Sequence, residues 1–452
     1  MTAAAAYRDA LAAGGTTIRE PEAPSRPAGE LELQARWFSG EFGRDWVSED
    51  GAPVRVEDFG RWNHEAGPDF VDARIRIGNE ERRGAIELDL DVRDWERHGH
   101  AGNPAFREAI AHLFVHRPAA RFFTRTCDHR EVPQIALPPA KSHPASTARP
   151  PEPITTEATR ARAILHAAAR HRLDLKAAAL QRHASAHGED AAQFAAIAVA
   201  LGYKRNQTPF LLLAQRVDVR AAAAPDGEAL LFGAAGFLET PQPPAADPAT
   251  RAYLRVLWED WWSARARCER WILPPEAWHF AGLRPANHPH RRVAALAAVA
   301  RSWSPIRSAL ASSERTAFLH TLESLGHPFW DTRFNLKAAA FDRPQALVGP
   351  ERLRDILLNV FYPQAISRTE DAWDAFVRES GPVPATIMRA TADRFFEDAL
   401  PRSLREAVLQ QGLLQLERDH RMAPDPPAFL AALRNATFPP PGHCPTSSSV
   451  RD

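Results

Sequence analysis

Apolar and polar residues alternate along two short stretches in the first quarter of the chain. Residues 71–77 (VDARIRI) and 85–92 (AIELDLDV) both carry apolar side chains at every second position. Side chains alternate between the two faces of a strand, so this pattern predicts two half-buried β-strands. Residues 80–83 lie between them and are predicted to link the two strands as a hairpin. Further strands are predicted over 52–63, over 109–117 and within 122–138 (FFTRTC…VPQIALP), and a helix over 32–38.

The pattern changes after a stretch rich in proline and serine, 137–153 (LPPAKSHPASTARPPEP), which is typical of a linker. Beyond it, apolar residues recur at helical spacing, so helices are predicted through most of 154–438. We therefore predict an α+β or α/β protein, in which an N-terminal mixed β-sheet domain precedes a mostly α-helical C-terminal domain. The expected segments are a flexible leader (1–29), the sheet domain (30–136), the linker (137–153), the helical domain (154–438) and a disordered tail (439–452).

Composition narrows the class of protein only slightly. The net charge is zero at pH 7, so charge alone does not predict nucleic-acid binding. No apolar run approaches the roughly 20 residues that span a bilayer, and no membrane partner is expected. Three scattered cysteines and a start without a signal-peptide pattern are typical of the cytoplasm. Four residues are lysine, and the first of them is Lys141.

Acidic residues gather on the predicted hairpin. Glu87 and Asp89 share one face of the second strand, and Asp69 stands in a Gly-Pro turn at the head of the first. Carboxylates brought this close repel one another unless a cation neutralises them, and their hard oxygen atoms suit Mg²⁺ or Mn²⁺. Such an ion could activate a water molecule and stabilise charge on a phosphate. The alternative interpretation is an ordinary solvated strand face, on which the acids pair with arginines across the sheet.

Histidines follow the acidic residues directly. His98 and His100, in the sequence HGH, are candidate metal ligands, and His64, His112 and His116 are further candidates. The alternative is that each histidine is a surface or hydrogen-bonding residue.

The helical half contains a stretch, 277–313, with five arginines and no acidic residue. Arg284, Arg291, Arg292 and Arg301 are candidate nucleic-acid-binding residues, because guanidinium groups bind phosphates. The alternative is that these arginines pair with acids on other helices.

Several motifs carry a resemblance to a known family. The spacing NxxxGPDFxxAxIxI, followed by GxIEL and DWxxHGH, is similar to that of the uncharacterised bacterial family called domain of unknown function 2851. The likeness continues at 202–214, 228–238, 283–297 and 355–363, and would cover most of residues 30–420. The resemblance to this family implies no particular activity, because none is established for the family.

A remoter likeness is to the PD-(D/E)xK nucleases, which have a restriction-endonuclease-like fold. Pro68-Asp69 resembles the PD step, and Glu87-Leu88-Asp89 resembles the acid-x-Lys step on the next strand. The resemblance implies that Asp69 and Glu87 are catalytic metal ligands. Asp89 stands where that superfamily has lysine, so it is either a third metal ligand or the mark of a degenerate site.

Three hypotheses follow for the function. The first is a metal-dependent nuclease-like hydrolase, in which Asp69, Glu87 and Asp89 hold Mg²⁺ or Mn²⁺ at a phosphodiester and nucleic acid is the partner. The second is a non-catalytic scaffold that binds nucleic acid or protein. The third is a zinc-dependent hydrolase that uses His98 and His100.

Overall fold

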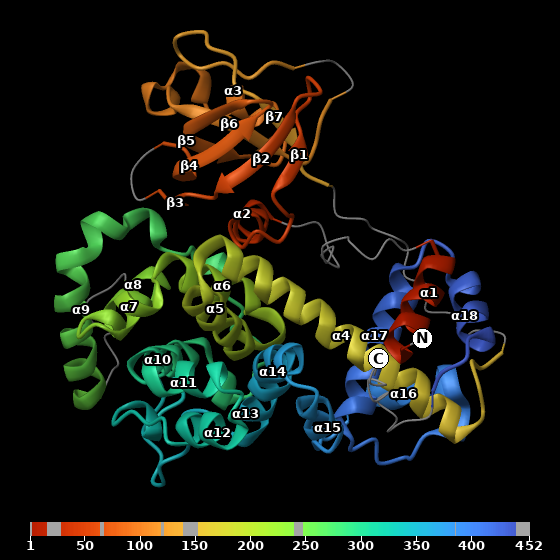
Figure 1. Cartoon of the computed structure of the whole chain (residues 1–452). Helices are drawn as coiled ribbons and strands as arrows, with labels where there is room; N and C mark the ends of the chain where they lie inside the picture. Colours follow the sequence, from red (N-terminus) through yellow and green to blue (C-terminus); the bar gives the residue numbers. More distant parts are fainter. Residues whose placement is uncertain are drawn as a thin grey trace, which may run out of the picture. The chain divides into compact units, whose positions relative to one another are not determined.

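The computed structural model of the chain describes residues 2–15, 29–63, 67–118, 122–138, 152–238, 247–384 and 386–439 (Figure 1). The chain divides into two compact units. The first consists of Met1–Ala23, Lys141–Ala178 and Arg354–Asp452, and the second of Pro24–Ala140 and Ala179–Leu353. The predicted fold class is confirmed, since a mixed sheet lies in the N-terminal part and helices fill most of the rest.

The second unit contains the mixed sheet. Its strands are β1 (Asp45–Val47), β2 (Pro53–Asp58), β3 (Arg61–Trp62), β4 (Phe70–Ile77), β5 (Glu80–Leu88), β6 (Ala109–Phe114) and β7 (Gln134–Ala136). They are arranged in the order β1-β2-β4-β5-β6-β7, and β3 pairs with β4. The strands from β1 to β5 pair antiparallel, whereas β6 runs parallel to β5 and β7 parallel to β6. The parallel step from β5 to β6 is bridged by the short helix α3 (Asp94–Arg97).

The hairpin of β4 and β5 forms as predicted, but its turn lies earlier in the chain. Residues 80–83, predicted as the link, belong to β5, and Ile77 pairs directly with Glu80. The turn is made at Gly78, whose φ of +57° is a left-handed conformation that glycine adopts without steric cost.

A β-bulge near the start of β4 departs from the predicted alternation. Phe70 pairs with Ile86, but Ala73 pairs with Gly84, so β4 carries one residue more than β5 between these pairs. Asp72 lies inside the bulge with φ +59°. Both Phe70 and Ala73 are therefore fully buried despite being three residues apart.

Helix α2 (Glu30–Phe38) contacts both the sheet and a helix of the same unit. Its Phe38 ring stacks on Phe70 with ring centroids 5.5 Å apart. On its other side, Gln215 of α6 (Gln207–Arg216) donates to the Ala35 carbonyl at 2.9 Å. These contacts hold the first residue of the helix, Glu30, near the end of β5.

Strands β5 and β6 approach each other closely at Gly84. A Cβ atom at this position would lie 2.3 Å from the Glu108 carbonyl oxygen, which accepts the Ala85 amide at 2.9 Å. A backbone atom cannot move aside as a flexible side chain can. Gly84 is therefore required for the pairing that places β5 beside β6.

The helices that follow the sheet are α4 (Ala158–His187), α5 (Glu189–Gly202), α6, α7 (Val219–Ala223), α8 (Gly227–Ala234), α9 (Pro248–Cys268), α10 (Pro289–Arg301), α11 (Trp303–Ala311), α12 (Arg315–Glu323), α13 (Pro350–Ile356), α14 (Tyr362–Arg368), α15 (Asp371–Val377), α16 (Thr386–Phe396), α17 (Ala407–Met422) and α18 (Pro426–Asn435). Alanine-rich stretches such as 291–301 form these helices because alanine has the highest helix propensity. Within the described part of the chain, no helix is both long and apolar enough to cross a membrane.

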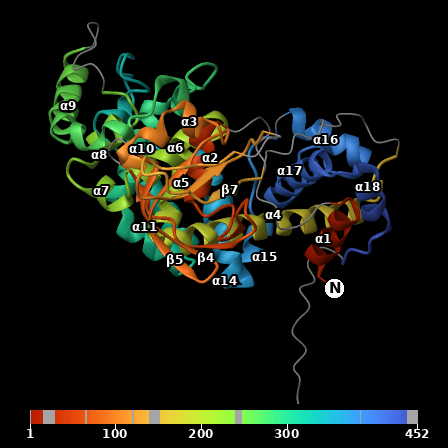
Figure 2. The same cartoon turned by 90° about the horizontal axis from the view of Figure 1, so that it is seen from above.

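Part of the expected flexible leader is instead a packed helix, α1 (Ala3–Ala13). Thr2 caps its first turn, and Tyr7, Ala10 and Leu11 form a buried stripe along one side. This stripe lies in the first unit, where α1 packs against α18 (Figure 2). The rest of the leader (16–28), most of the predicted linker (139–151) and the tail from 440 lie outside the described residues.

Asp419 on α17 accepts a hydrogen bond from the Tyr7 hydroxyl at 2.9 Å. The burial of this carboxyl group leads to a prediction about the pH dependence of stability. Burial raises the pKa of Asp419 to about 6 from a reference value of 3.8, so the folded state holds this proton more tightly than the unfolded chain. The resulting stabilisation is present below the unfolded pKa and is lost as pH rises through about 6. Relative to wild type, Asp419→Asn should therefore gain up to about 3 kcal/mol between about pH 4 and pH 8.

Urea unfolding of both proteins across this pH range measures the gain. The comparison cancels every other titrating group that the two proteins share. A difference in stability that is the same at all pH values would contradict the assigned role of Asp419.

Candidate metal centre

Two hydrogen bonds connect Asp69 with the end of β5, and each runs from a backbone amide on one side to a carboxylate on the other. The Asp69 amide donates to Glu87 Oε2 at 2.9 Å, and the Leu88 amide donates to Asp69 Oδ2 at 3.1 Å. The bulge in β4 follows directly after Asp69 and sets the register in which it meets β5. Each side chain therefore accepts a hydrogen bond from the backbone of the other strand, which holds the two residues together across the strand pair.

Asp89 follows the last residue of β5 and lies among histidines. Its Oδ1 lies 3.2 Å from His98 Nδ1, and its Oδ2 lies 3.1 Å from His112 Nε2. The residue is 2% exposed. Asp89 is thus held by imidazoles, whereas the next acid along the chain, Asp91, is paired with the exposed Arg93 at 2.6 Å.

A tight sequence of turns brings His98 and His100 to the same place. The Asp91 amide donates to Asp94 Oδ2 at 3.0 Å, which turns the chain from the end of β5 into α3. Gly99 then adopts φ +76°, so the two histidines on either side of it converge, with ring centroids 5.4 Å apart. The glycine of the HGH sequence is therefore what allows both imidazoles to reach Asp89.

Three residues are placed as the ligands of one metal ion would be. Ligand atoms of Asp89, His98 and His100 all lie within 4.8 Å of one another. This is close to the separation of roughly 3–4 Å between ligands of a single ion with bonds of about 2.1 Å. Within the described residues, Asp89, His98 and His100 are the group of three or more candidate ligands whose ligand atoms all lie within 4.8 Å of one another.

His100 supplies a further observation in favour of an ion. Its Nε2 atom is buried and lies 3.1 Å from Glu87 Oε1, but forms no hydrogen bond to any described residue. Buried polar atoms are rarely left without a hydrogen bond, so an imidazole nitrogen that lies 3.1 Å from a carboxylate without forming one is placed as a metal ligand would be. Glu87 thereby adjoins the three-residue group, while Asp69 lies behind Glu87.

The electrostatics of the site favour a bound cation. Burial raises the pKa of Glu87 to about 8, and the neighbouring Asp89 charge adds to the rise. Burial, together with the Glu87 charge, also raises the pKa of Asp69 well above its usual range. Burial lowers the pKa of His100, which keeps its imidazole neutral and able to bind a metal. A divalent ion would offset the repulsion that these buried acids exert on one another.

Two residues of the site could not be identified from the sequence pattern. Glu30, at the start of α2, has a pKa raised by burial and by the Asp89 charge, while the charges of His98 and His100 lower it. Arg270 follows α9, donates to the Gly67 carbonyl at 3.0 Å, and lowers the pKa of both Asp69 and Glu87. Neither lies near the hairpin in sequence, so only the tertiary fold brings them to it.

The remaining histidine candidates, His64, His112 and His116, are not part of the group of three ligands. His112 is fully buried and contacts Asp89 as described. His116 forms an isolated backbone bridge with Asp91. His64 lies outside the described residues.

The four candidate arginines of the helical half do not form one exposed surface. Arg291 and Arg292 are 1% and 4% exposed, and their guanidinium groups donate to backbone carbonyls, including those of Arg333 and Leu347. Arg301 pairs with Glu228 at 3.2 Å. The exposed Arg284 pairs with Glu351 at 3.3 Å. Arg291 and Arg292 are thus structural contacts of α10, because buried guanidinium groups must have their donors satisfied.

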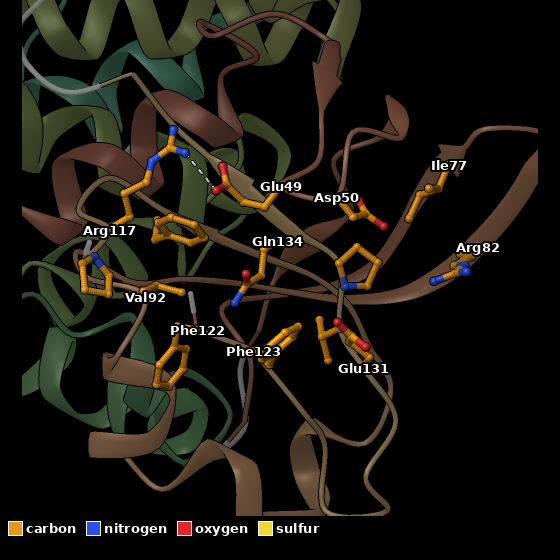
Figure 3. A pocket seen from close by; sticks show the side chains of 14 residues that line it. Glu49, Asp50, Ile77, Arg82, Val92, Arg117, Phe122, Phe123, Glu131 and Gln134 are labelled. Carbon is orange, nitrogen blue, oxygen red and sulfur yellow. Dashed lines mark hydrogen bonds and ion pairs between the residues drawn. The ribbon is translucent and has the colours of Figure 1, made fainter. Parts of the chain in front are cut away.

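A pocket of about 630 Å³ lies elsewhere on the sheet (Figure 3). It is lined by residues of the β1–β2 connection, by Phe114 at the end of β6, by Phe122 and Phe123, and by Gln134 at the start of β7. The ion pair of Arg117 with Glu49, 2.9 Å long, stands at its edge. None of the site residues predicted from the sequence is among those that line it.

The fold and the cluster define a mixed-sheet protein with a helical C-terminal part and a buried Asp–His group at the end of β5. The chain belongs to the family described as "Protein of unknown function (DUF2851)", whose model matches residues 32–380. The predicted family is thereby confirmed, while the likeness to PD-(D/E)xK nucleases stays a prediction. No curated protein and no solved structure matches the chain.

Proposed function

We propose that the protein is a metal-dependent phosphodiesterase that acts on nucleic acid, with its ion held by Asp89, His98 and His100. The observation that carries this proposal is the approach of their ligand atoms to within 4.8 Å, where the buried Nε2 of His100 forms no hydrogen bond. Three protein ligands leave coordination positions open for a water molecule and a phosphate oxygen. An ion bound in this way lowers the pKa of the water and stabilises the charge that develops on the phosphate.

The ligand set favours Mn²⁺ over Mg²⁺. Magnesium prefers oxygen ligands and retains water, whereas transition-metal ions accept imidazole, with zinc, iron and nickel binding it more strongly than manganese does. Two of the three ligands here are imidazoles. Zinc is the ion expected if the histidines dominate binding, so the tests below include it.

The other acids support the centre from β4 and β5. Glu87 Oε2 is occupied by the Asp69 amide, which leaves Oε1 directed toward His100 at 3.1 Å. Glu87 is thus placed to orient the attacking water or to serve as a further ligand. Asp69 fixes the end of β5 through the Leu88 amide.

Access and charge favour a large anionic substrate. The His98 side chain is 49% exposed, so the centre opens to solvent on that side. Arg270 is exposed and carries a positive charge beside Asp69 and Glu87, where it would attract a phosphate.

A non-catalytic scaffold that binds nucleic acid or protein is the second candidate. The observation that favours it is the absence of lysine before Lys141, since PD-(D/E)xK nucleases carry a lysine at the position of Asp89. In that case the fold would bind the ion or the polymer without cleaving it.

Hydrolysis assays separate the two candidates. Wild type, Glu87→Gln and Glu96→Gln are incubated with single- and double-stranded DNA and RNA in the presence of Mn²⁺, Mg²⁺ or Zn²⁺. Glutamine at 87 retains the acceptor for the Asp69 amide but removes the charge, and should lower the rate on the order of 100-fold. Glu96 is exposed on α3, so its substitution is the matched control. If the wild-type protein binds these nucleic acids but cleaves none of them with any of the three ions, the result would support the non-catalytic scaffold instead.

A further inference from the structure

A line of hydrogen bonds leads from Gln134 of β7, which lines the pocket, to the buried proposed metal ligand Asp89. Gln134 Nε2 donates to Thr124 Oγ1 at 2.7 Å, and Thr124 Oγ1 lies 2.8 Å from His112 Nδ1. His112 Nε2 then lies 3.1 Å from Asp89 Oδ2. Thr124, His112 and Asp89 are 1%, 0% and 2% exposed, so water does not compete for the hydrogen bonds among these three residues.

The chemistry of the groups fixes the positions of the protons. An ionised carboxylate only accepts hydrogen bonds, so the His112 nitrogen that faces Asp89, Nε2, must carry a proton. A ring with its proton on Nε2 has Nδ1 free to accept a hydrogen bond. The Thr124 hydroxyl accepts from the Gln134 amide, which can only donate there, and gives its own proton to Nδ1.

The packing around His112 holds its ring in this orientation. Trp95 lies 5.1 Å from it and Phe114 lies 5.6 Å from it, measured between ring centroids. Trp95 is in turn fixed by a hydrogen bond from its Nε1 to the Arg125 carbonyl at 2.9 Å.

We propose that His112, oriented by Thr124 and Gln134, is the positioning residue that fixes Asp89 as a ligand through one oxygen. The inference rests on the proposed function, because it concerns how the same centre holds its ion. With Oδ2 occupied by the His112 proton, Oδ1 is the oxygen that faces His98 and the ion. A carboxylate restricted to one oxygen leaves one more coordination position for water or phosphate, and partners of this kind also orient the ligand.

Paired substitutions at Thr124 test the positioning role. Thr124→Val has nearly the same shape but lacks the hydroxyl, so His112 Nδ1 becomes a buried acceptor without a donor and the ring is held only through Nε2. Thr124→Ser retains the hydroxyl and is the matched control. The dissociation constant for Mn²⁺, measured by titration calorimetry, should rise 10–100-fold in the valine variant and about threefold or less in the serine variant.

A nitrogen NMR measurement on the His112 ring examines the hydrogen bonds without metal. Wild type and Thr124→Ser should carry the proton on Nε2 and show the shift of a hydrogen-bonded Nδ1, and Thr124→Val should lose that shift at Nδ1. A proton on Nδ1 in wild type would overturn the inference, as would Mn²⁺ affinity in the valine variant equal to that of wild type. If the wild-type protein binds none of Mn²⁺, Mg²⁺ and Zn²⁺, the proposed metal centre is refuted, and the inference with it. The NMR measurement would still show which nitrogen of His112 carries the proton, so the two failures can be told apart.

Discussion

Mn²⁺ should raise the melting temperature of the wild-type protein, and the Asp89→Asn variant should lose this rise. Asp89 is the one carboxylate in the group of three ligands, and a neutral amide oxygen binds a divalent cation far more weakly. The dissociation constant should increase at least about 100-fold. At an ion concentration 100 times the wild-type dissociation constant, the wild type gains about 2.7 kcal/mol, and the variant gains under 1 kcal/mol.

Thermal unfolding with and without the ion measures this effect. Asparagine still accepts the proton of His112 Nε2, so the variant should fold. Glu96→Gln, in the exposed part of α3, should retain the full rise. A rise in wild type that survives in Asp89→Asn would place the ion elsewhere. A response to Zn²⁺ alone, abolished by His98→Ala and His100→Ala, would assign the centre to zinc.

Replacing Trp95 with alanine should destabilise the sheet-containing unit by about 3–5 kcal/mol. The indole is fully buried and packs against Phe106, with ring centroids 5.6 Å apart, as well as against His100 and His112. Its removal leaves a cavity between the two histidines and frees the Arg125 carbonyl. The ion-induced rise in melting temperature should shrink as well, because the ring fixes the orientation of both imidazoles.

Calorimetric unfolding measures the loss in the transition that Mn²⁺ shifts. Trp95→Phe preserves most of the packing and should cost less than the alanine variant. Trp262 on α9 is 54% exposed, and its replacement with alanine is the matched control, with an expected cost below about 1 kcal/mol. Equal costs at the two tryptophans would contradict the role assigned to Trp95.

The fold class was predictable from the sequence because it depends on periodicity, which is local. The alternation in 71–77 and 85–92 predicted β4 and β5, and the change to helical spacing predicted the helices of the C-terminal part. The details that failed depend on backbone conformation. The turn at Gly78 and the bulge at Asp72 both use left-handed φ values, which alternating hydrophobicity does not report.

The candidate site was predictable only as far as it lies on one hairpin and the loop after it. The sequence could name Asp69, Glu87, Asp89, His98 and His100, but not which of them converge. The grouping of Asp89 with both histidines depends on the turn at Gly99, and Glu30 and Arg270 arrive from distant segments. Arg291 and Arg292 looked like phosphate ligands because sequence does not reveal burial. The metal and the substrate stay predictions.

The close approach at Gly84 also limits how this gene can change. Every missense substitution at a glycine codon introduces a residue with a Cβ atom, and at position 84 that atom would meet the Glu108 oxygen at 2.3 Å. The shift would separate β5, which carries Glu87 and leads into Asp89, from β6, which carries His112. In a library of random variants, codon 84 should therefore tolerate as few changes as the codons of the proposed ligands, although glycine has no side chain that could bind an ion.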